Sequence, residues 1–173
     1  SRGLGDVYKR QGTTNMNRKI IITFMVSLFL INCAGTSSNA PKVRDHRVSI
    51  GLATNEDFVT LANRVLNRHR FVIEQTEDRG AGTVIICQYV YPNITNLEIL
   101  NGINEVRYQL MLESRVKGNG AGMYSVRAIV KSFGRPEGSE EWIDIATNDE
   151  TKKRIKDFSN DLKIEFENRI RAF

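Results

Sequence analysis

The sequence predicts an α+β domain: a mainly antiparallel, four-stranded sheet with two helices packed on one face, in the order β-α-β-β-β-α. Two long segments, residues 105–117 and 123–133, alternate polar and apolar side chains, which is typical of strands with one buried face. Two further segments, residues 54–70 and 147–173, place apolar side chains at helical spacing. Because no repeat or internal linker separates these segments, we expect one α/β sandwich domain over residues 47–173.

The composition and the location of the charges limit the classes of function. The chain has 173 residues, 40% of them apolar, so it can bury a core and is not typical of a disordered protein. Residues 1–32 carry five basic side chains and one acidic one, which leaves 20 basic and 19 acidic side chains in the rest. That near-neutral remainder disfavours nucleic acid as a partner. Two cysteines cannot form a disulfide framework.

The first 32 residues are not expected to belong to the fold. Residues 1–15 precede any apolar pattern, and Asp6–Gln11 resembles a translated sequencing-library adaptor, so we expect a non-native leader here. The alternative is a short natural extension. Residues 16–32 have the pattern of a signal peptide, in which Arg18 and Lys19 precede twelve largely apolar residues. Twelve residues are too few for a bilayer-spanning helix, which needs about 20.

The residues around Cys33 resemble the lipobox of bacterial lipoproteins. Leu30 lies three residues before Cys33, although Asn32 departs from the usual small residue, and a polar, flexible stretch follows. We therefore expect acyl chains on Cys33, with residues 33–46 as lipidated cysteine and tether. Because Ala34 rather than aspartate follows the cysteine, resemblance to the sorting rule of enterobacterial lipoproteins implies the outer membrane, facing the periplasm. The alternative is an ordinary secretory signal with an incidental cysteine.

The first elements of the domain follow from local patterns. Residues 47–52 alternate polar and apolar side chains and predict a half-buried strand. Thr54, with Asp57 three residues later, resembles a capping box at a helix start. Residues 74–82 are expected to form a polar turn region, and residues 83–91, rich in β-branched and aromatic types, a buried strand. The helix stripe consists of Phe58, Leu61, Ala62, Val65 and Leu66.

Two long strands and a closing helix complete the predicted domain. Residues 118–120, a Gly-Asn-Gly sequence, predict the hairpin turn between the strands. Thr147–Glu150 is interpreted as a second capping box. The inward strand positions are Val106, Tyr108, Leu110, Leu112 and Val116, then Tyr124, Val126, Ala128 and Val130. The stripe of the closing helix is Ile155, Phe158, Leu162, Phe166, Ile170 and Phe173.

Residue types that support catalysis or metal binding are scarce. His46 and His69 are the only histidines, and neither has a cysteine or carboxylate at metal-ligand spacing. We expect His69 to be a solvated residue at a helix end, and Cys87 to be a small core residue rather than a reactive thiol. Since no nucleophile–base pair is visible, the sequence predicts a non-enzymatic protein with no catalytic residue, no metal site and no cofactor.

The polar face of the two long strands has the clearest functional character. It carries five basic side chains: Arg107, Arg115, Lys117, Arg127 and Lys131. Cations clustered on a face that the helices leave open can meet phosphate or carboxylate groups of a partner. The alternative is an ordinary solvated face, with Glu105 and Glu113 as cross-strand partners.

Three local patterns stand out within the predicted order of elements. They are Asn101-Gly102 leading into residues 105–110, the strand at residues 124–133, and Ala146–Glu150 at the start of the final helix. In these patterns and in the order of elements, residues 47–170 resemble the lipopolysaccharide (LPS)-assembly lipoprotein family, LptE. The resemblance implies an outer-membrane lipoprotein that supports LPS assembly and export as plug and assembly partner of the LPS-translocating β-barrel. The five basic residues then become candidate contacts for LPS or for the barrel.

The chain departs from this family at two points. Residues 34–40 lack the family's Gly-aromatic-x-Leu-Arg run, and two basic positions implicated in LPS contact fall on Leu100 and Thr147, so those roles are not carried over. A partner of another class stays open: a peptidoglycan synthase, with the chain as its periplasmic lipoprotein activator. Such activators usually need a long tether, whereas about 13 residues, at most about 45 Å, separate Cys33 from the first predicted strand.

Overall fold

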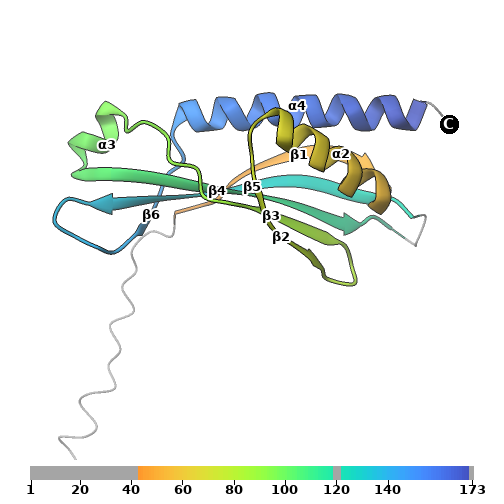
Figure 1. The fold of residues 1–173 in the computed structure, drawn as a ribbon, viewed down its shortest axis with the longest axis horizontal. Helices are drawn as coiled ribbons and strands as arrows, with labels where there is room; N and C mark the ends of the chain where they lie inside the picture. Colours follow the sequence, from red (N-terminus) through yellow and green to blue (C-terminus); the bar gives the residue numbers. More distant parts are fainter. Residues whose placement is uncertain (1–42, 119–121, 172–173) are drawn as a thin grey trace, which may run out of the picture. The chain divides into compact units, whose positions relative to one another are not determined.

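The computed structural model describes residues 43–118 and 122–171, which form an α+β domain (Figure 1). The predicted leader, signal peptide and Cys33 lie outside the described residues, as do most of the tether, part of the 118–120 turn and Phe173. Within the described part, no helix combines the length and apolar composition needed to cross a bilayer. The elements are β1 (His46–Ala53), α2 (Asn55–Arg68), β2 (Ile73–Asp78), β3 (Thr83–Cys87), α3 (Asn96–Leu100), β4 (Ile103–Val116), β5 (Tyr124–Pro136), β6 (Ile143–Ile145) and α4 (Asp149–Arg171).

The strands form one antiparallel sheet in the order β1-β5-β4-β3-β2. The short β6 also pairs with β5, and it continues the edge of β5 that β1 occupies further along. The two long strands β4 and β5 form the middle of the sheet and are paired from Ile103 and Pro136 to Val116 and Tyr124, with one irregularity between Ile103 and Glu105. The predicted α+β class and mainly antiparallel sheet are therefore confirmed.

The predicted count of four strands and two helices is wrong, because the described residues form six strands and three helices. β2 lies where a polar turn was predicted: as an edge strand held by backbone pairing to β3, it keeps polar side chains exposed. β6 and α3 have three and five residues, too few to produce a periodic pattern. β3 ends at Cys87, and a single bridge between Val90 and Tyr108 is what remains of the longer strand predicted there.

The helix starts show how local sequence sets the element boundaries. The Thr54 side chain accepts a hydrogen bond from the Asp57 backbone N–H at 3.1 Å, so the predicted start of α2 is confirmed. α4 begins one residue later than predicted, because Asn148 caps it by accepting the Thr151 N–H at 2.8 Å. Thr147 instead accepts a hydrogen bond from the Ser132 hydroxyl at 3.0 Å.

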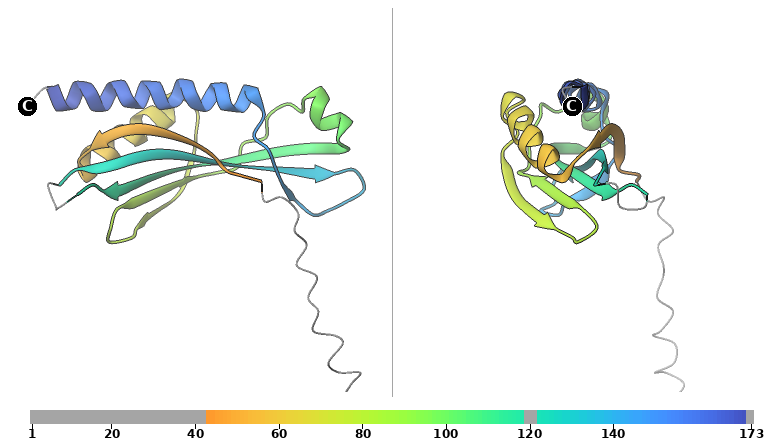
Figure 2. Two further views of the ribbon diagram at one scale, coloured as in Figure 1. Left: turned by 180° about the vertical axis from the view of Figure 1, so that it is seen from behind. Right: turned by 90° about the vertical axis from the view of Figure 1, so that its right-hand side faces the viewer.

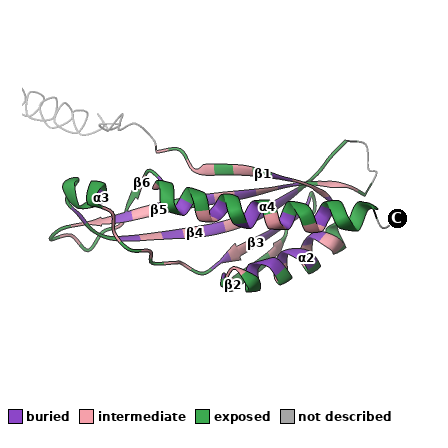
Figure 3. Cartoon of the chain, turned by 90° about the horizontal axis from the view of Figure 1, so that it is seen from above, coloured by how far each residue is buried: buried purple, intermediate pink, exposed green. Residues whose placement is uncertain are grey.

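α2 and α4 lie side by side on one face of the sheet, and no helix covers the other face of the described sheet (Figures 1 and 2). Their apolar stripes and the inward side chains of β4 and β5 are buried against each other (Figure 3). All five predicted stripe positions of α2 are buried. Two inward predictions are wrong: Val116 and Ile170 are about half exposed, because they lie at element ends beyond the cover of the core.

Candidate functional site

The outer face of the sheet is the surface of β4 and β5 that points away from α2 and α4. The register places Arg107 opposite Phe133, Gln109 opposite Lys131, and Glu113 opposite Arg127. Because side chains two residues apart share a face, Arg107, Arg115, Arg127 and Lys131 all lie on the outer face, as the alternation predicted. Lys117 is exposed just past the end of β4, where its backbone N–H donates to the carbonyl of Met123.

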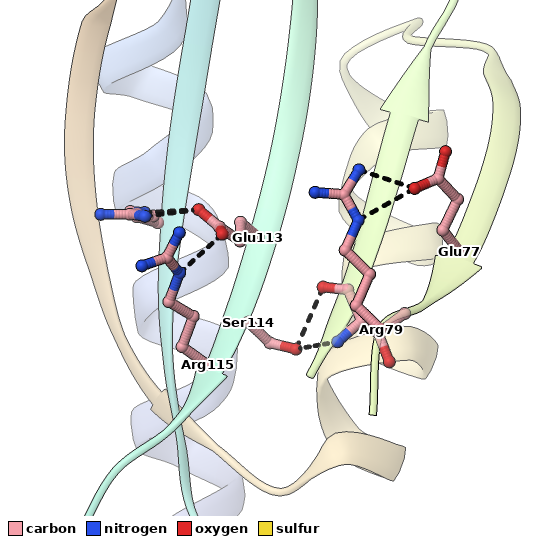
Figure 4. A network of polar contacts seen from close by, with 7 residues as sticks. Glu77, Arg79, Glu113, Ser114 and Arg115 are labelled. Atoms are coloured by element: carbon pink, nitrogen blue, oxygen red, sulfur yellow. Dashed lines mark hydrogen bonds and ion pairs between the residues drawn. The ribbon is translucent and has the colours of Figure 1, made fainter. Parts of the chain in front are cut away.

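Glu113 binds two of these arginines on the outer face (Figure 4). One carboxylate oxygen accepts Arg115 Nε at 2.6 Å, and the other accepts Arg127 Nε at 2.7 Å. Burial alone would raise the pKa of Glu113, but the hydrogen bonds and positive charges of both arginines outweigh it and hold the pKa below its ordinary value. Arg115 and Arg127 are therefore engaged within the chain, as the solvated-face alternative anticipated for Glu113.

Arg107 is held in a different way, by aromatic rings. Its guanidinium carbon lies 4.1 Å from the ring centroids of both Tyr89 and Trp142, and 5.5 Å from that of Phe133. We call these four residues the arginine stack. Its Nε is buried and has no hydrogen-bond partner in the described part of the chain. The rings attract the charge of the guanidinium, whereas its N–H groups lie in its own plane, so further hydrogen bonds form at its edge.

The remaining charges of the outer face separate into paired and unpaired groups. Glu105 pairs with Arg135 and not with any of the five predicted cations. The guanidinium carbon of Arg135 also lies 5.5 Å from the centroid of the Trp142 ring. Within residues 43–118 and 122–171, neither Lys117 nor Lys131 has a carboxylate partner at ion-pair distance. Lys131 lies two positions from Phe133 on β5, next to the arginine stack.

A second candidate surface is an apolar groove of about 620 Å³ where α3, β6 and the start of α4 meet. Its apolar walls come from Leu97 of α3, Ile103 of β4, and Ile143 and Ile145 of β6. Gly134 makes this arrangement fit, because a Cβ there would lie 3.0 Å from methyl carbons of both Ile103 and Ile145. The groove suits an apolar ligand or surface rather than an ion.

α3 is positioned at this groove by the Thr95 capping box. Glu98 Oε2 accepts hydrogen bonds from the backbone N–H of Thr95 at 2.7 Å and from its hydroxyl at 2.8 Å. Glu98 Oε1 accepts one from Asn148 Nδ2 at 3.0 Å. The carboxylate is therefore buried and joins α3 to the first turn of α4.

The residues considered for catalysis have structural roles in the fold. His69 caps the C-terminal end of α2, as predicted, but it is not solvated: its side chain is only 19% exposed, and its Nε2 lies 2.9 Å from Asp161 Oδ2 of α4. Burial, with a smaller contribution from Lys152, lowers the pKa of His46. Cys87 is completely buried, as predicted, and burial raises its pKa to about 12. In the described residues no three His, Cys, Asp or Glu side chains gather as metal ligands.

The alternation of polar and apolar side chains predicted the cations of the outer face, but no pattern in the sequence predicted the rings around Arg107. Tyr89 and Trp142 come from segments outside the long strands, and their distance from Arg107 along the chain left no local pattern. Chemically, the outer face offers hydrogen bonds and charge, whereas the groove offers apolar area.

No family model matches the sequence, and no curated protein matches it significantly.

Proposed function

We propose that this chain is a non-enzymatic outer-membrane lipoprotein that supports LPS assembly and export as plug and assembly partner of the LPS-translocating β-barrel. Acyl chains on Cys33 would hold the domain at the inner leaflet, facing the periplasm. The proposal rests on the lipobox-like segment and on the family resemblance of residues 47–170. The observation that carries it furthest is a sheet with both long helices on one face and a charged outer face left open.

The charges of the outer face favour a polar partner surface. The lumen of an outer-membrane barrel is lined with polar side chains, so a charged sheet face can dock there without burying unpaired apolar area. Glu113, Arg115 and Arg127 neutralise one another in part, which lowers the cost of moving this region out of water. Such a face matches a plug better than it matches a catalytic cleft.

The same face supplies the proposed contacts for LPS. The phosphate groups of LPS accept paired hydrogen bonds from guanidinium groups, and the edge of the Arg107 guanidinium is suited to donate them. Lys131 and Lys117 add positive charge without a carboxylate partner in the described residues. We therefore expect Arg107, Lys131 and Lys117 to contribute more to LPS binding than Arg115 and Arg127, which Glu113 already engages.

Site-specific photo-cross-linking in the native envelope tests the proposal. A photoreactive side chain replaces Lys131 on the outer face, and a matched one replaces Lys156, which is exposed on the opposite, helical side. We expect the probe at position 131 to capture a large β-barrel protein and the probe at position 156 to capture much less of it. Depletion of the chain should then reduce LPS at the cell surface.

The alternative partner gives a different product in this experiment. Capture of a penicillin-binding protein at position 131, with normal LPS export after depletion, would replace the proposal with the peptidoglycan-synthase activator. Equal capture at positions 131 and 156 would remove the outer face as the docking surface. If Arg107→Gln together with Lys131→Gln leaves LPS binding unchanged, the proposed LPS contacts are wrong.

A further inference from the structure

The short helix α3 has an inverted distribution of side chains. Its one charged residue, Glu98, is turned inward and is only 8% exposed, with both carboxylate oxygens hydrogen-bonded. Its aliphatic residues are turned outward: Leu97 is 69% exposed, Ile99 55% and Leu100 84%. A helix on a water-facing surface normally shows the opposite arrangement. Exposed aliphatic side chains gathered in this way mark a surface that contacts something apolar.

One of the exposed aliphatic side chains of α3 also borders the groove. Leu97 lines the groove, and across it lies Ile143 of β6, which is 45% exposed. Nine large apolar side chains are exposed in the described residues. Four of them belong to this end of the domain: Leu97, Ile99, Leu100 and Ile143. Leu97 and Leu100 lie three residues apart and so share one face of α3. We call this surface the α3–β6 patch: Leu97, Leu100, Ile143 and the groove.

The chain reaches the domain beside this patch. The first described residues, Val43, Arg44 and Asp45, line a crevice together with Ile145 and Thr147, and these last two residues also line the groove. Cys33 lies ten residues before Val43, so even a fully extended segment between them spans at most about 36 Å. An anchor on Cys33 would thus limit how far the α3–β6 patch can lie from the membrane that holds the anchor.

We propose that the α3–β6 patch rests on the surface of the phospholipid bilayer into which Cys33 is anchored, with Leu97 and Leu100 at the boundary between headgroups and acyl chains. This inference rests on the acyl anchor of the proposed function. The occupant is a zwitterionic bilayer rather than an anionic one, because Glu98, Asp149 and Glu150 line the groove against the single positive charge of Lys152.

The contact would act together with the anchor. Burial of several aliphatic side chains at an interface adds to the acyl chains on the same molecule, and the short tether makes the second contact intramolecular. Such a contact fixes the orientation of the domain on the membrane. The outer face would then be presented to a partner in a defined direction.

A fluorescent label at an exposed position tests this contact in the lipidated full chain. The label is attached at Leu100→Cys, with a matched label at Ile164→Cys, a residue that is 54% exposed on α4. Cys33 is acylated and Cys87 is completely buried, so neither competes for the reagent. The protein is reconstituted into vesicles of phosphatidylethanolamine and phosphatidylcholine that carry a nitroxide quencher on the acyl chains.

We expect quenching to be several-fold stronger at position 100 than at position 164. Adding Leu97→Asn, or replacing part of the lipid with anionic phosphatidylglycerol, should weaken the quenching at position 100. If the protein floats with the vesicles but the two labels are quenched equally or not at all, the bilayer contact is wrong while the anchor stands. Quenching at position 100 that needs no nitroxide and grows with protein concentration would assign the patch to a second copy instead. Protein that does not float with the vesicles would remove both the contact and the anchor.

Discussion

Two arginines on the same sheet face are stabilised by different chemistry. Arg127 shares the Glu113 carboxylate with Arg115, so its charge is balanced in part within the chain. Arg107 lies beside Tyr89 and Trp142, where the rings attract its charge but accept no strong hydrogen bond. The charge of Arg107 is therefore left for solvent or a partner to balance to a greater extent than that of Arg127.

Glu113 gives the outer face a defined dependence on pH. Glu113→Gln keeps the size of the side chain but removes the charge shared by Arg115 and Arg127, so we expect a loss of about 1–3 kcal/mol in the free energy of unfolding at neutral pH. The folded protein keeps Glu113 ionised at pH values where the unfolded chain binds a proton. Urea unfolding at a series of pH values measures both effects.

The sign of the pH effect follows from the lowered pKa of Glu113. The stabilisation is complete above the ordinary pKa of 4.5 and is lost as the pH falls through the lower pKa of the folded state. The difference between wild type and Glu113→Gln should therefore shrink in acid. Glu140→Gln, at an exposed position in the β5–β6 connection, is the matched control and should change stability little. A constant difference down to strongly acidic pH would contradict this account.

At the scale of elements, the junction between α3 and α4 depends on Asn148. Its side-chain oxygen accepts a hydrogen bond from the Thr151 backbone N–H and so caps α4. Its side-chain NH₂ group donates a hydrogen bond to the buried carboxylate of Glu98 on α3. Asn148→Ala removes both bonds, so we expect a loss of about 1–2 kcal/mol, at the upper end for a helix cap. The measurement is thermal or urea unfolding followed by circular dichroism.

A second asparagine of α4 provides the comparison for Asn148. Asn160 is exposed within the same helix, where alanine is the better helix former by up to about 0.7 kcal/mol. Asn160→Ala should leave stability unchanged or raise it slightly. If Asn148→Ala behaves in the same way, Asn148 does not hold α3 and α4 together, and the position of the groove wall needs another explanation.

Periodicity predicted the elements whose side chains repeat over several turns or pleats. α2, α4, β4 and β5 each carry a long apolar stripe, and the alternation of β4 and β5 placed Arg107, Arg127 and Lys131 on one face. β2 and β6 are held at sheet edges by backbone pairing, which side-chain pattern does not encode. The arginine stack and the groove are assembled from distant segments, so no local pattern predicted Trp142 beside Arg107 or Leu97 beside Ile143.

At the scale of the described domain, one hydrophobic core joins the sheet to both long helices. It includes side chains of β1, β3, β4, β5, α2 and α4. Two surfaces with different chemistry then lie outside this core: the charged outer face and the apolar α3–β6 patch. Since a shared core makes unfolding cooperative, a group buried within it reports on the whole domain.

Cys87 is such a group, and from its burial we expect the free energy of unfolding to fall in alkali. Burial raises its pKa from 9.0 to about 12, so between these values the folded protein keeps the thiol while the unfolded chain carries a thiolate. Unfolding then releases a proton, and this residue should lower the free energy of unfolding by up to about 1.4 kcal/mol per pH unit. Below pH 9 it should contribute no pH dependence. Lysines also lose charge in alkali, so the measurement compares the slopes of wild type and Cys87→Ala in urea. Cys87→Ala should be less stable at neutral pH but show a shallower decline above pH 9. Parallel slopes would mean that the thiol ionises in the folded state, and hence that the core opens around β3 before the domain unfolds as a whole.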